Sequence, residues 1–305
     1  MHPVLFEIPG LGFPVRAFGV MVAAGFLLGL HIWTRLVRRH GLEPLKDEER
    51  VGNVAMWVLI GVIAGGRLMY VIVELLRYMG SGDEGSAGYQ YLHDPLSILF
   101  VWQGGLVMYG GFFGAILLGL WGCRKYDLHL FNGLDTGLTA GFFGQAVGRV
   151  GCLLVGDDYG AIVPEGMRSL PFPITVEVPD AAWLAANPES LFPTALAGET
   201  LWCTQLWMAF NALMLGLIGL WLLRRRRYFG QVAVTLLSLY AVTRFTIEAF
   251  RGDELRGVWF GGALSTSQVI SIIGLVLGVA LLVKLRGRRD PALATTGQPA
   301  PPPAS

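Results

Sequence analysis

Long apolar segments recur along the 305-residue sequence and constrain its fold more than any other feature. An α-helix of about 20 apolar residues is long enough to cross about 30 Å of hydrocarbon. Only 15% of the residues are charged, against about 25% in an average soluble domain. The sequence therefore predicts an all-α polytopic membrane protein with seven transmembrane helices, near residues 16–34, 53–76, 104–122, 130–155, 200–223, 231–250 and 262–283.

Basic residues are unevenly distributed among the connections between these expected helices. Fifteen Lys and Arg residues lie in the connections at 35–50, 124–125, 224–227 and 284–289, whereas five lie in the alternate set. Because basic connections stay on the cytoplasmic side of a membrane, we expect the N-terminus outside and the C-terminus inside. An odd number of spans agrees with that orientation.

The remaining segments divide the chain into one membrane domain, residues 1–289, and a tail. Residues 156–199 carry six prolines and are predicted to form a small periplasmic head or lid, with a strand in FPITVEV. The apolar run after Pro95 is too short to span, which favours an interfacial or re-entrant helix. The Pro- and Ala-rich residues 290–305 are expected to be a disordered cytoplasmic tail.

Charge and motif content disfavour several other classes of protein. The formal net charge is +1, so no basic excess points to nucleic acid. Cys123, Cys152 and Cys203 lack metal-ligand or disulfide spacing and are interpreted as small buried residues. No nucleotide loop, zinc motif, haem attachment site or redox pair is visible in the sequence, so we expect no cofactor and no metal.

Three arginines, Arg67, Arg149 and Arg244, fall inside expected spans. An arginine at membrane depth usually faces a bundle interior or a wet cavity and has a partner. Each lies about six to nine residues before the outer end of its span, so all three can share one depth, roughly 9–14 Å below the outer boundary. A guanidinium binds phosphate bidentately, so we predict an anionic-lipid site at this level. Snorkelling or internal ion pairing is the alternative.

Two acidic residues lie close to this arginine pattern. Glu248 follows Arg244 by four residues, which places both on one helical face and predicts either a structural salt bridge or a catalytic pair. Asp135 lies near the inner start of the fourth expected span. It either caps or anchors that helix or contributes to the site, and the sequence leaves both choices open.

Glycine is dense in two segments, 104–114 and 144–160. Small residues let transmembrane helices approach closely, and most GxxxG pairs in the chain are interpreted as packing. Glycine at this density also weakens a helix, which is tolerated where the backbone lines a cavity or a ligand approaches closely. The predicted substrate contacts among these glycines are Gly105, Gly110, Gly148 and Gly151.

The stretch GQAVGRVGCLLVGDDYG at 144–160 resembles the signature of the prolipoprotein diacylglyceryl transferase family of bacterial membrane enzymes. The resemblance covers about residues 5–285 and includes further motifs in the family's order. They are GGRLMYVI at 65–72, FVWQGGLVMYGGFFG at 100–114, the Asp135 segment, TQLW at 204–207 and TRFTIEAFR at 243–251.

The resemblance implies transfer of a diacylglyceryl group from phosphatidylglycerol to the lipobox cysteine thiol of a prolipoprotein, giving a thioether and glycerol 1-phosphate. It therefore implies two partners, phosphatidylglycerol and prolipoprotein lipobox segments, and a place in the bacterial cytoplasmic membrane. Such an enzyme must orient the lipid, stabilise negative charge on the departing phosphate and help to remove the thiol proton.

The resemblance also implies roles for individual residues. Arg149 matches the family's signature arginine and is expected to bind the lipid phosphate. Arg244 matches the second essential arginine and is expected to complete the clamp or assist the leaving group, with Glu248 holding it in place. Arg67 matches a recurrent arginine whose role is left open.

Several positions depart from the family pattern. Many relatives carry His at the place of Tyr109, and that His is a proposed base. Because a free Tyr titrates at about pH 10, Tyr109 is expected to orient a group by hydrogen bonding while nearby arginines acidify the substrate thiol. Asp157 and Asp158 lie near the end of the stretch 144–160 and are expected to be polar lid contacts, with Asp157 assigned to substrate binding.

Two competing functions are also considered. The substitutions around Tyr109, Val155 and Ala161 are compatible with a catalytically altered relative that binds anionic phospholipid or lipoprotein precursors without transfer. A transporter or channel with arginines along an anion path is another class, but the sequence lacks the inverted repeats and matched broken helices that are typical of one.

Overall fold

The computed structural model describes residues 1–8, 13–83, 85–101, 104–252, 258–259 and 264–294. Within these residues, seven helices have 18 residues or more: α1 Ala17–His40, α2 Pro44–Ser81, α4 Met108–Lys125, α5 Leu130–Val155, α7 Thr204–Leu223, α8 Gln231–Glu248 and α9 Thr266–Lys284. Five of them, all but α4 and α8, are long and apolar enough to cross a membrane. These helices support the prediction of a polytopic membrane protein, whereas seven spans and their orientation stay predictions.

The ends of the long helices follow local signals in the sequence. α2 begins with Pro44, which fits the first helical turn, and ends at Ser81, before the capping residue Gly82, whose φ of 67° is left-handed. α9 begins with a capping box, in which Ser265 and Gln268 satisfy each other's backbone N–H groups. α7 begins at Thr204 rather than near residue 200 as predicted, because Thr200–Trp202 form a strand.

Short strands and helices complete the described part of the chain. Three antiparallel pairs join β1 Val4–Ile8 to β2 Phe13–Arg16, β3 Thr175–Glu177 to β4 Thr200–Trp202, and β5 Val258–Trp259 to β6 Leu264–Ser265. β3 confirms the strand predicted in FPITVEV. The shorter helices are α3 Ala87–His93, α6 Ala181–Ala186 and the 3₁₀ helices Pro95–Leu99, Glu165–Met167, Thr194–Leu196 and Pro291–Ala294.

Two of these helices bear on sequence predictions. The apolar run after Pro95 begins with the 3₁₀ helix Pro95–Leu99, and its interfacial or re-entrant position stays a prediction. The expected disordered tail begins with the 3₁₀ helix Pro291–Ala294, and its residues 295–305 lie outside the described part of the chain.

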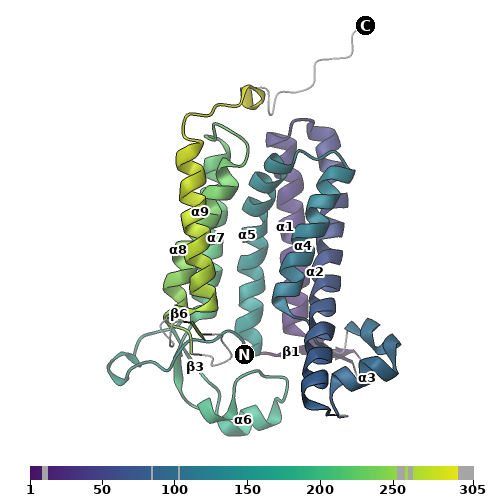
Figure 1. The fold of residues 1–305 in the computed structure, drawn as a ribbon. Coiled ribbons are helices and arrows are strands. Elements are labelled where there is room, and N and C mark those ends of the chain that lie inside the picture. The colour runs from purple at the N-terminus through teal and green to yellow at the C-terminus, as the bar shows by residue number, and fades with distance from the viewer. Residues whose placement is uncertain (9–12, 84, 102–103, 253–257, 260–263, 295–305) are drawn as a thin grey trace. The chain divides into compact units, whose positions relative to one another are not determined.

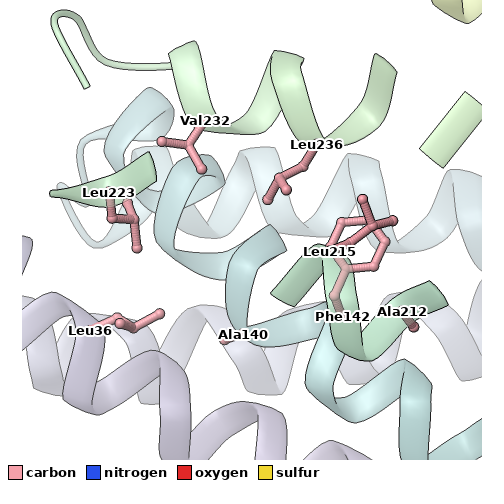
Figure 2. Packing of buried hydrophobic residues seen from close by; sticks show 8 residues of the cluster. All are labelled: Leu36, Ala140, Phe142, Ala212, Leu215, Leu223, Val232 and Leu236. Atoms are coloured by element: carbon pink, nitrogen blue, oxygen red, sulfur yellow. The ribbon is translucent and has the colours of Figure 1, made fainter. Parts of the chain in front are cut away.

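The chain divides into two compact units, of which the first comprises Met1–Leu36 and Leu134–Ser305. Its core lies between helices, where α1, α5, α7 and α8 contribute the buried side chains shown in Figure 2: Leu36, Ala140, Phe142, Ala212, Leu215, Leu223, Val232 and Leu236. Burying these apolar groups stabilises the contacts between the four helices. The Trp33 indole N–H also donates to the Thr136 hydroxyl at 3.0 Å, which joins α1 to α5.

A small head belongs to the first unit and follows α5. The β3–β4 pair and α6 surround a second apolar cluster, made of Val176, Val178, Leu184, Phe192, Leu201 and Cys203. Asp180 caps α6 by accepting from the Trp183 backbone N–H at 2.7 Å. In Figure 1, β6 marks one end of the first unit's helices, and α6 and β3 lie beyond that same end. The head therefore has an apolar cluster of its own, whereas its place on the periplasmic side and its role as a lid stay predictions.

The second unit comprises Val37–Gly133 and is built on α2 and α4. The two helices approach until their backbones nearly touch, since a Cβ on Gly114 would lie 2.1 Å from the Gly61 carbonyl oxygen. Such proximity is available only to residues without a side chain. α3 packs against the last turns of α2, where the Tyr78 and Tyr89 rings meet edge to face at 5.7 Å.

Candidate active site

The candidate site in the first unit is built where α5 ends. Arg149 lies in the last two turns of α5, and the chain then turns at Gly156, with a φ of 79°, and at Asp158, with a φ of 55°. This turn brings the Asp158 carboxylate back to Arg149, whose Nη1 donates to Asp158 Oδ2. The other carboxylate oxygen, Oδ1, accepts from Nη2 of Arg251. Asp158 therefore bridges two guanidinium groups.

The backbone after α5 is held in place by neighbouring elements. The Thr204 hydroxyl, at the start of α7, donates to the Asp158 carbonyl at 2.8 Å. Gly160 N–H donates to the Trp202 carbonyl at 3.0 Å, and Ala161 N–H donates to the Phe250 carbonyl at 2.8 Å. β4, α7 and the segment after α8 thus fix the position from which the Asp158 side chain projects.

A second ion pair lies at the end of α8. Arg244 Nη1 contacts Glu248 Oε2 one helical turn away, as their spacing predicted. Glu248 also lies 3.9 Å from Arg251 and accepts a hydrogen bond from the Ser265 hydroxyl at 3.0 Å. Arg251 therefore joins the two ion pairs into a charged chain of five residues, Arg149, Asp158, Arg251, Glu248 and Arg244.

The charged chain carries more positive than negative charge. It holds three guanidiniums and two carboxylates. Burial alone would raise the pKa of the Asp158 carboxyl, but the Arg149 and Arg251 charges outweigh burial and hold that pKa below its ordinary value. Within these five described residues, guanidiniums therefore outnumber carboxylates.

Asp157 lies beside the charged chain but in a different electrostatic setting. Its Oδ1 accepts from the Asp158 backbone N–H at 2.8 Å. Burial and the neighbouring Asp158 charge raise the pKa of the Asp157 carboxyl above its ordinary value. Of the two adjacent aspartates, Asp158 is therefore the one held as an anion by arginines.

The second unit holds Arg67 and the glycine-rich segment that precedes α4. The Arg67 guanidinium donates to the backbone carbonyls of Ser97, Ile98, Gly104 and Gly105 at 2.7–3.3 Å. It also lies over the Tyr70 and Tyr91 rings, at 5.6 and 5.4 Å. The Arg67 charge is thus used to hold the backbone at residues 97–98 and 104–105.

A comparison with known proteins bears directly on this arrangement. A family model described as "Prolipoprotein diacylglyceryl transferase" matches residues 3–284. The chain belongs to the prolipoprotein diacylglyceryl transferase family. The match includes every residue of the charged chain and the Arg67 segment, and it confirms the resemblance found in the sequence.

Individual relatives agree with the family model. A phosphatidylglycerol–prolipoprotein diacylglyceryl transferase of Geobacter sulfurreducens is 29% identical over 291 residues, which cover 95% of this chain and 97% of the relative. Proteins of the same name from Rhodospirillum centenum and Clostridium tetani are 27% and 28% identical over 98% and 92% of this chain, and over 97% and 96% of their own. The sequence similarity therefore extends over nearly the full length of this chain and of each relative.

The structure places the predicted site residues of this transferase family member in three locations. Arg149, Arg244, Glu248 and Asp157 lie together at the end of α5 and α8. Arg67, Gly105, Tyr109 and Gly110 belong to the second unit. Asp135 lies near the start of α5, fourteen residues before Arg149, or roughly 21 Å of helix.

Asp135 is assigned by the structure to a buried ion pair rather than to the charged chain. Its Oδ2 accepts from Arg226 Nη1 at 2.9 Å and from the Gly230 backbone N–H at 3.0 Å. Its Oδ1 accepts from the Ala233 N–H at 2.8 Å. Asp135 therefore satisfies the N-terminus of α8 and anchors α5 to it, which agrees with the anchoring role that the sequence left open, whereas its contribution to the substrate site stays a prediction.

The glycines differ in what surrounds them. Gly105 has a left-handed φ of 74°, and a Cβ there would lie 2.8 Å from Arg67 Nη1. A Cβ on Gly110 would lie 2.3 Å from the Gly65 carbonyl oxygen, so Gly110 serves the packing of α4 on α2. Gly151 faces Met21 in α1, whereas the space beside Gly148 is open.

Tyr109 occupies the second position of α4, and 43% of the residue is exposed. Within the residues that the structure describes, its hydroxyl has no hydrogen-bond partner. Tyr109 was predicted to orient a group by hydrogen bonding. No described side chain of the second unit is that group.

Arg251 is the site residue that sequence reasoning missed. It was counted among the basic residues of the outer connections. A signal was present, because Arg251 follows Glu248 by three residues and Arg244 by seven, positions that share one face of a continued helix.

A cluster of possible metal ligands and a cavity were also considered as functional sites. The thiol of Cys152 and the carboxylates of Asp157 and Asp158 have donor atoms within 4.8 Å of one another, but two guanidiniums already engage Asp158 and would repel a metal cation. In the second unit, a cavity of about 590 Å³ contains none of the predicted site residues. Leu42, Glu43, Asp47, Arg50, Cys123, Arg124, Asp127, Leu128 and His129 line it.

The three cysteines of this family member are buried and unpaired with one another. Burial raises the pKa of the Cys203 thiol to about 11. We expect a thiol reagent such as Ellman's reagent to modify none of the three at pH 8 in the folded protein and all three after denaturation. Rapid modification of any one in the folded protein would contradict this assignment.

Proposed function

We propose that this chain transfers the diacylglyceryl group of phosphatidylglycerol to the lipobox cysteine thiol of a prolipoprotein. The observation that carries the proposal is the charged chain, in which Arg149 of the signature and Arg244 gather with Arg251 around two carboxylates. Membership of the family supplies the substrates, since its named relatives are phosphatidylglycerol–prolipoprotein diacylglyceryl transferases.

The reaction exchanges one bond to the lipid's glycerol carbon for another. The substrate sulfur forms a C–S bond, the C–O bond to phosphate breaks, and its electron pair leaves with the phosphate oxygen as glycerol 1-phosphate. Arg149 binds the phosphate and Arg244 stabilises the negative charge that grows on it. Fixed guanidiniums are effective here because they need no reorganisation during the reaction.

The charged chain also favours loss of the thiol proton. A thiolate is the nucleophile, and nearby positive charge lowers the pKa of a thiol from about 8.5. A phenol is a poor base near neutral pH, because a free Tyr titrates at about pH 10. The proton therefore leaves to water, with Tyr109 orienting a substrate group by hydrogen bonding.

In this proposal Arg67 organises the backbone of the second unit, to which it belongs. Arg67 holds the backbone at residues 97–98 and 104–105, and its contact with the carbonyls of Gly104 and Gly105 fixes the backbone that precedes Tyr109. Arg67 then acts as a positioning residue for the backbone of its own unit. The proposed substrate contacts are Gly148 and Asp157 in the first unit and Gly105 in the second.

The proposed topology follows from the charge distribution along the chain. The seven long helices all span the bacterial cytoplasmic membrane, with the N-terminus and the head on the periplasmic side. The charged chain then lies near the outer leaflet, where it meets both phosphatidylglycerol and the exported prolipoprotein. The head over residues 156–199 serves as a lid.

A reconstituted assay tests the proposal. We expect purified protein in vesicles that contain phosphatidylglycerol to convert a lipobox peptide to a diacylglyceryl thioether, detected by mass spectrometry. Vesicles of phosphatidylethanolamine alone, or a peptide with Ser in place of the lipobox Cys, are the controls and should give no product. Phosphatidylglycerol binding without any thioether would favour the catalytically altered relative, and an anion flux through the vesicles would favour a transporter.

A further inference from the structure

Asp158 has the features of an internal ligand for the site's arginines. Its two carboxylate oxygens accept from Arg149 and Arg251, which come from separate elements. A phosphodiester carries the same single negative charge and offers the same kind of paired oxygen acceptors to guanidinium donors. The side chain of Asp158 is 27% exposed, compared with 17% for Arg149 and 11% for Arg251, so the anion is the more accessible partner.

The Asp158 backbone is fixed on both sides of its side chain. Its carbonyl accepts from the Thr204 hydroxyl at 2.8 Å, and its N–H donates to Asp157 Oδ1 at 2.8 Å. Its φ of 55° is left-handed, a conformation that Asp adopts more readily than most residues. Rotation of the side chain alone can therefore remove the carboxylate from the arginines while the turn stays in place.

We propose that Asp158 competes with the substrate phosphate for Arg149 and Arg251, occupying both guanidiniums in the empty site and turning away when phosphate binds. The inference rests on the proposed function, which makes the phosphate that of phosphatidylglycerol. The exchange conserves charge, because one monoanion replaces another. It also keeps both arginines paired when no lipid is present, which lowers the cost of burying them.

The same competition promotes product release. Cleavage leaves the phosphate as a monoester, glycerol 1-phosphate, which near neutral pH carries more negative charge than the lipid diester and binds arginines more strongly. A carboxylate that returns to the guanidiniums as the product loosens prevents the product from rebinding. Asp158 thus sets the affinity of the site for both phosphate ligands.

The main test is Asp158→Asn, which keeps the size of the side chain and removes its charge. We expect the KM for phosphatidylglycerol and the inhibition constant of glycerol 1-phosphate each to fall about three- to tenfold, with a lower kcat where product release limits turnover. If Asp158 only held Arg149 in position, its loss would weaken phosphate binding and raise both constants. An unchanged or higher KM and inhibition constant would therefore overturn the proposal.

Two further variants separate charge from general disturbance. Asp158→Glu retains the competing charge and should restore the inhibition constant toward that of the wild type; a value as low as that of the Asn variant would contradict the proposal. Glu189→Gln removes a carboxylate of the same head that pairs with Arg16 instead. It should leave both constants within twofold of the wild type.

A measurement on the wild-type protein does not depend on the folding of any variant. Carbodiimide labelling of carboxyl groups, read by mass spectrometry, should modify Asp158 at least twofold faster when glycerol 1-phosphate saturates the site, whereas Glu189 should not change. Unchanged or slower labelling of Asp158 would overturn the proposal. Because this readout needs no turnover, it distinguishes failure of the anion exchange from failure of the transferase assay.

Discussion

Arg149→Ala is expected to lower kcat/KM for diacylglyceryl transfer about a hundred- to a thousandfold. The variant removes a fixed cation from the atoms on which negative charge grows during the reaction. Arg149→Lys keeps the charge but loses the planar pair of donors, so we expect a loss of about tenfold or more. Initial rates of thioether formation at several phosphatidylglycerol concentrations measure both effects.

The fold should survive the Arg149→Ala change, because Asp158 keeps Arg251 as a partner. The melting temperature of the purified variant provides that control. Arg168→Ala is the matched variant, since Arg168 pairs with Glu199 in the head, where the ion pair is partly exposed, and should cost less than twofold in rate. An Arg149→Ala enzyme that retains more than a tenth of the wild-type kcat/KM would remove Arg149 from the catalytic assignment.

Asp135→Ala is expected to destabilise the protein by about 3–5 kcal/mol, since it leaves the buried Arg226 charge without this carboxylate. Both side chains are almost completely buried. The change also takes an acceptor from the Gly230 and Ala233 N–H groups at the start of α8. Unfolding of the detergent-solubilised protein, followed by heat or by denaturant, measures the loss.

A double variant tests whether the ion pair is the cause. Asp135→Leu with Arg226→Met removes both charges and should recover part of the stability lost in Asp135→Ala, because no unpaired charge remains buried. Glu189→Ala, at an exposed ion pair, should change stability by less than about 1 kcal/mol. If Asp135→Ala kept wild-type stability and lost transfer, Asp135 would return to the substrate site.

The sequence predicted the long helices well because their signal is local. The apolar run at 130–155 coincides with α5. The ends of α2 were predicted too far inward, since the helix continues through charged residues at both ends, from Pro44 to Ser81, where hydropathy no longer marks it. The N-terminal strands β1 and β2 were not predicted, because short strands give only a weak pattern.

The site was predicted in part, for a physical reason that differs between residues. Arg244 and Glu248 share a helical face, which spacing reveals. Burial of Arg67 was correctly taken to demand partners, but a sequence cannot distinguish backbone carbonyls from a bound phosphate. The contacts of Asp158 depend on a left-handed turn, so its place between Arg149 and Arg251 required the structure.

The length of α2 has a consequence for the part of the chain that it carries. Its 38 residues extend over about 57 Å, almost twice the roughly 30 Å thickness of a hydrocarbon core. A helix of this length is longer than the hydrocarbon core is thick. Its final turns contact α3 through the Tyr78 and Tyr89 rings. A change in bilayer thickness would change the tilt or the depth of α2. Bilayer thickness would therefore set the distance between α3 and the lipid surface.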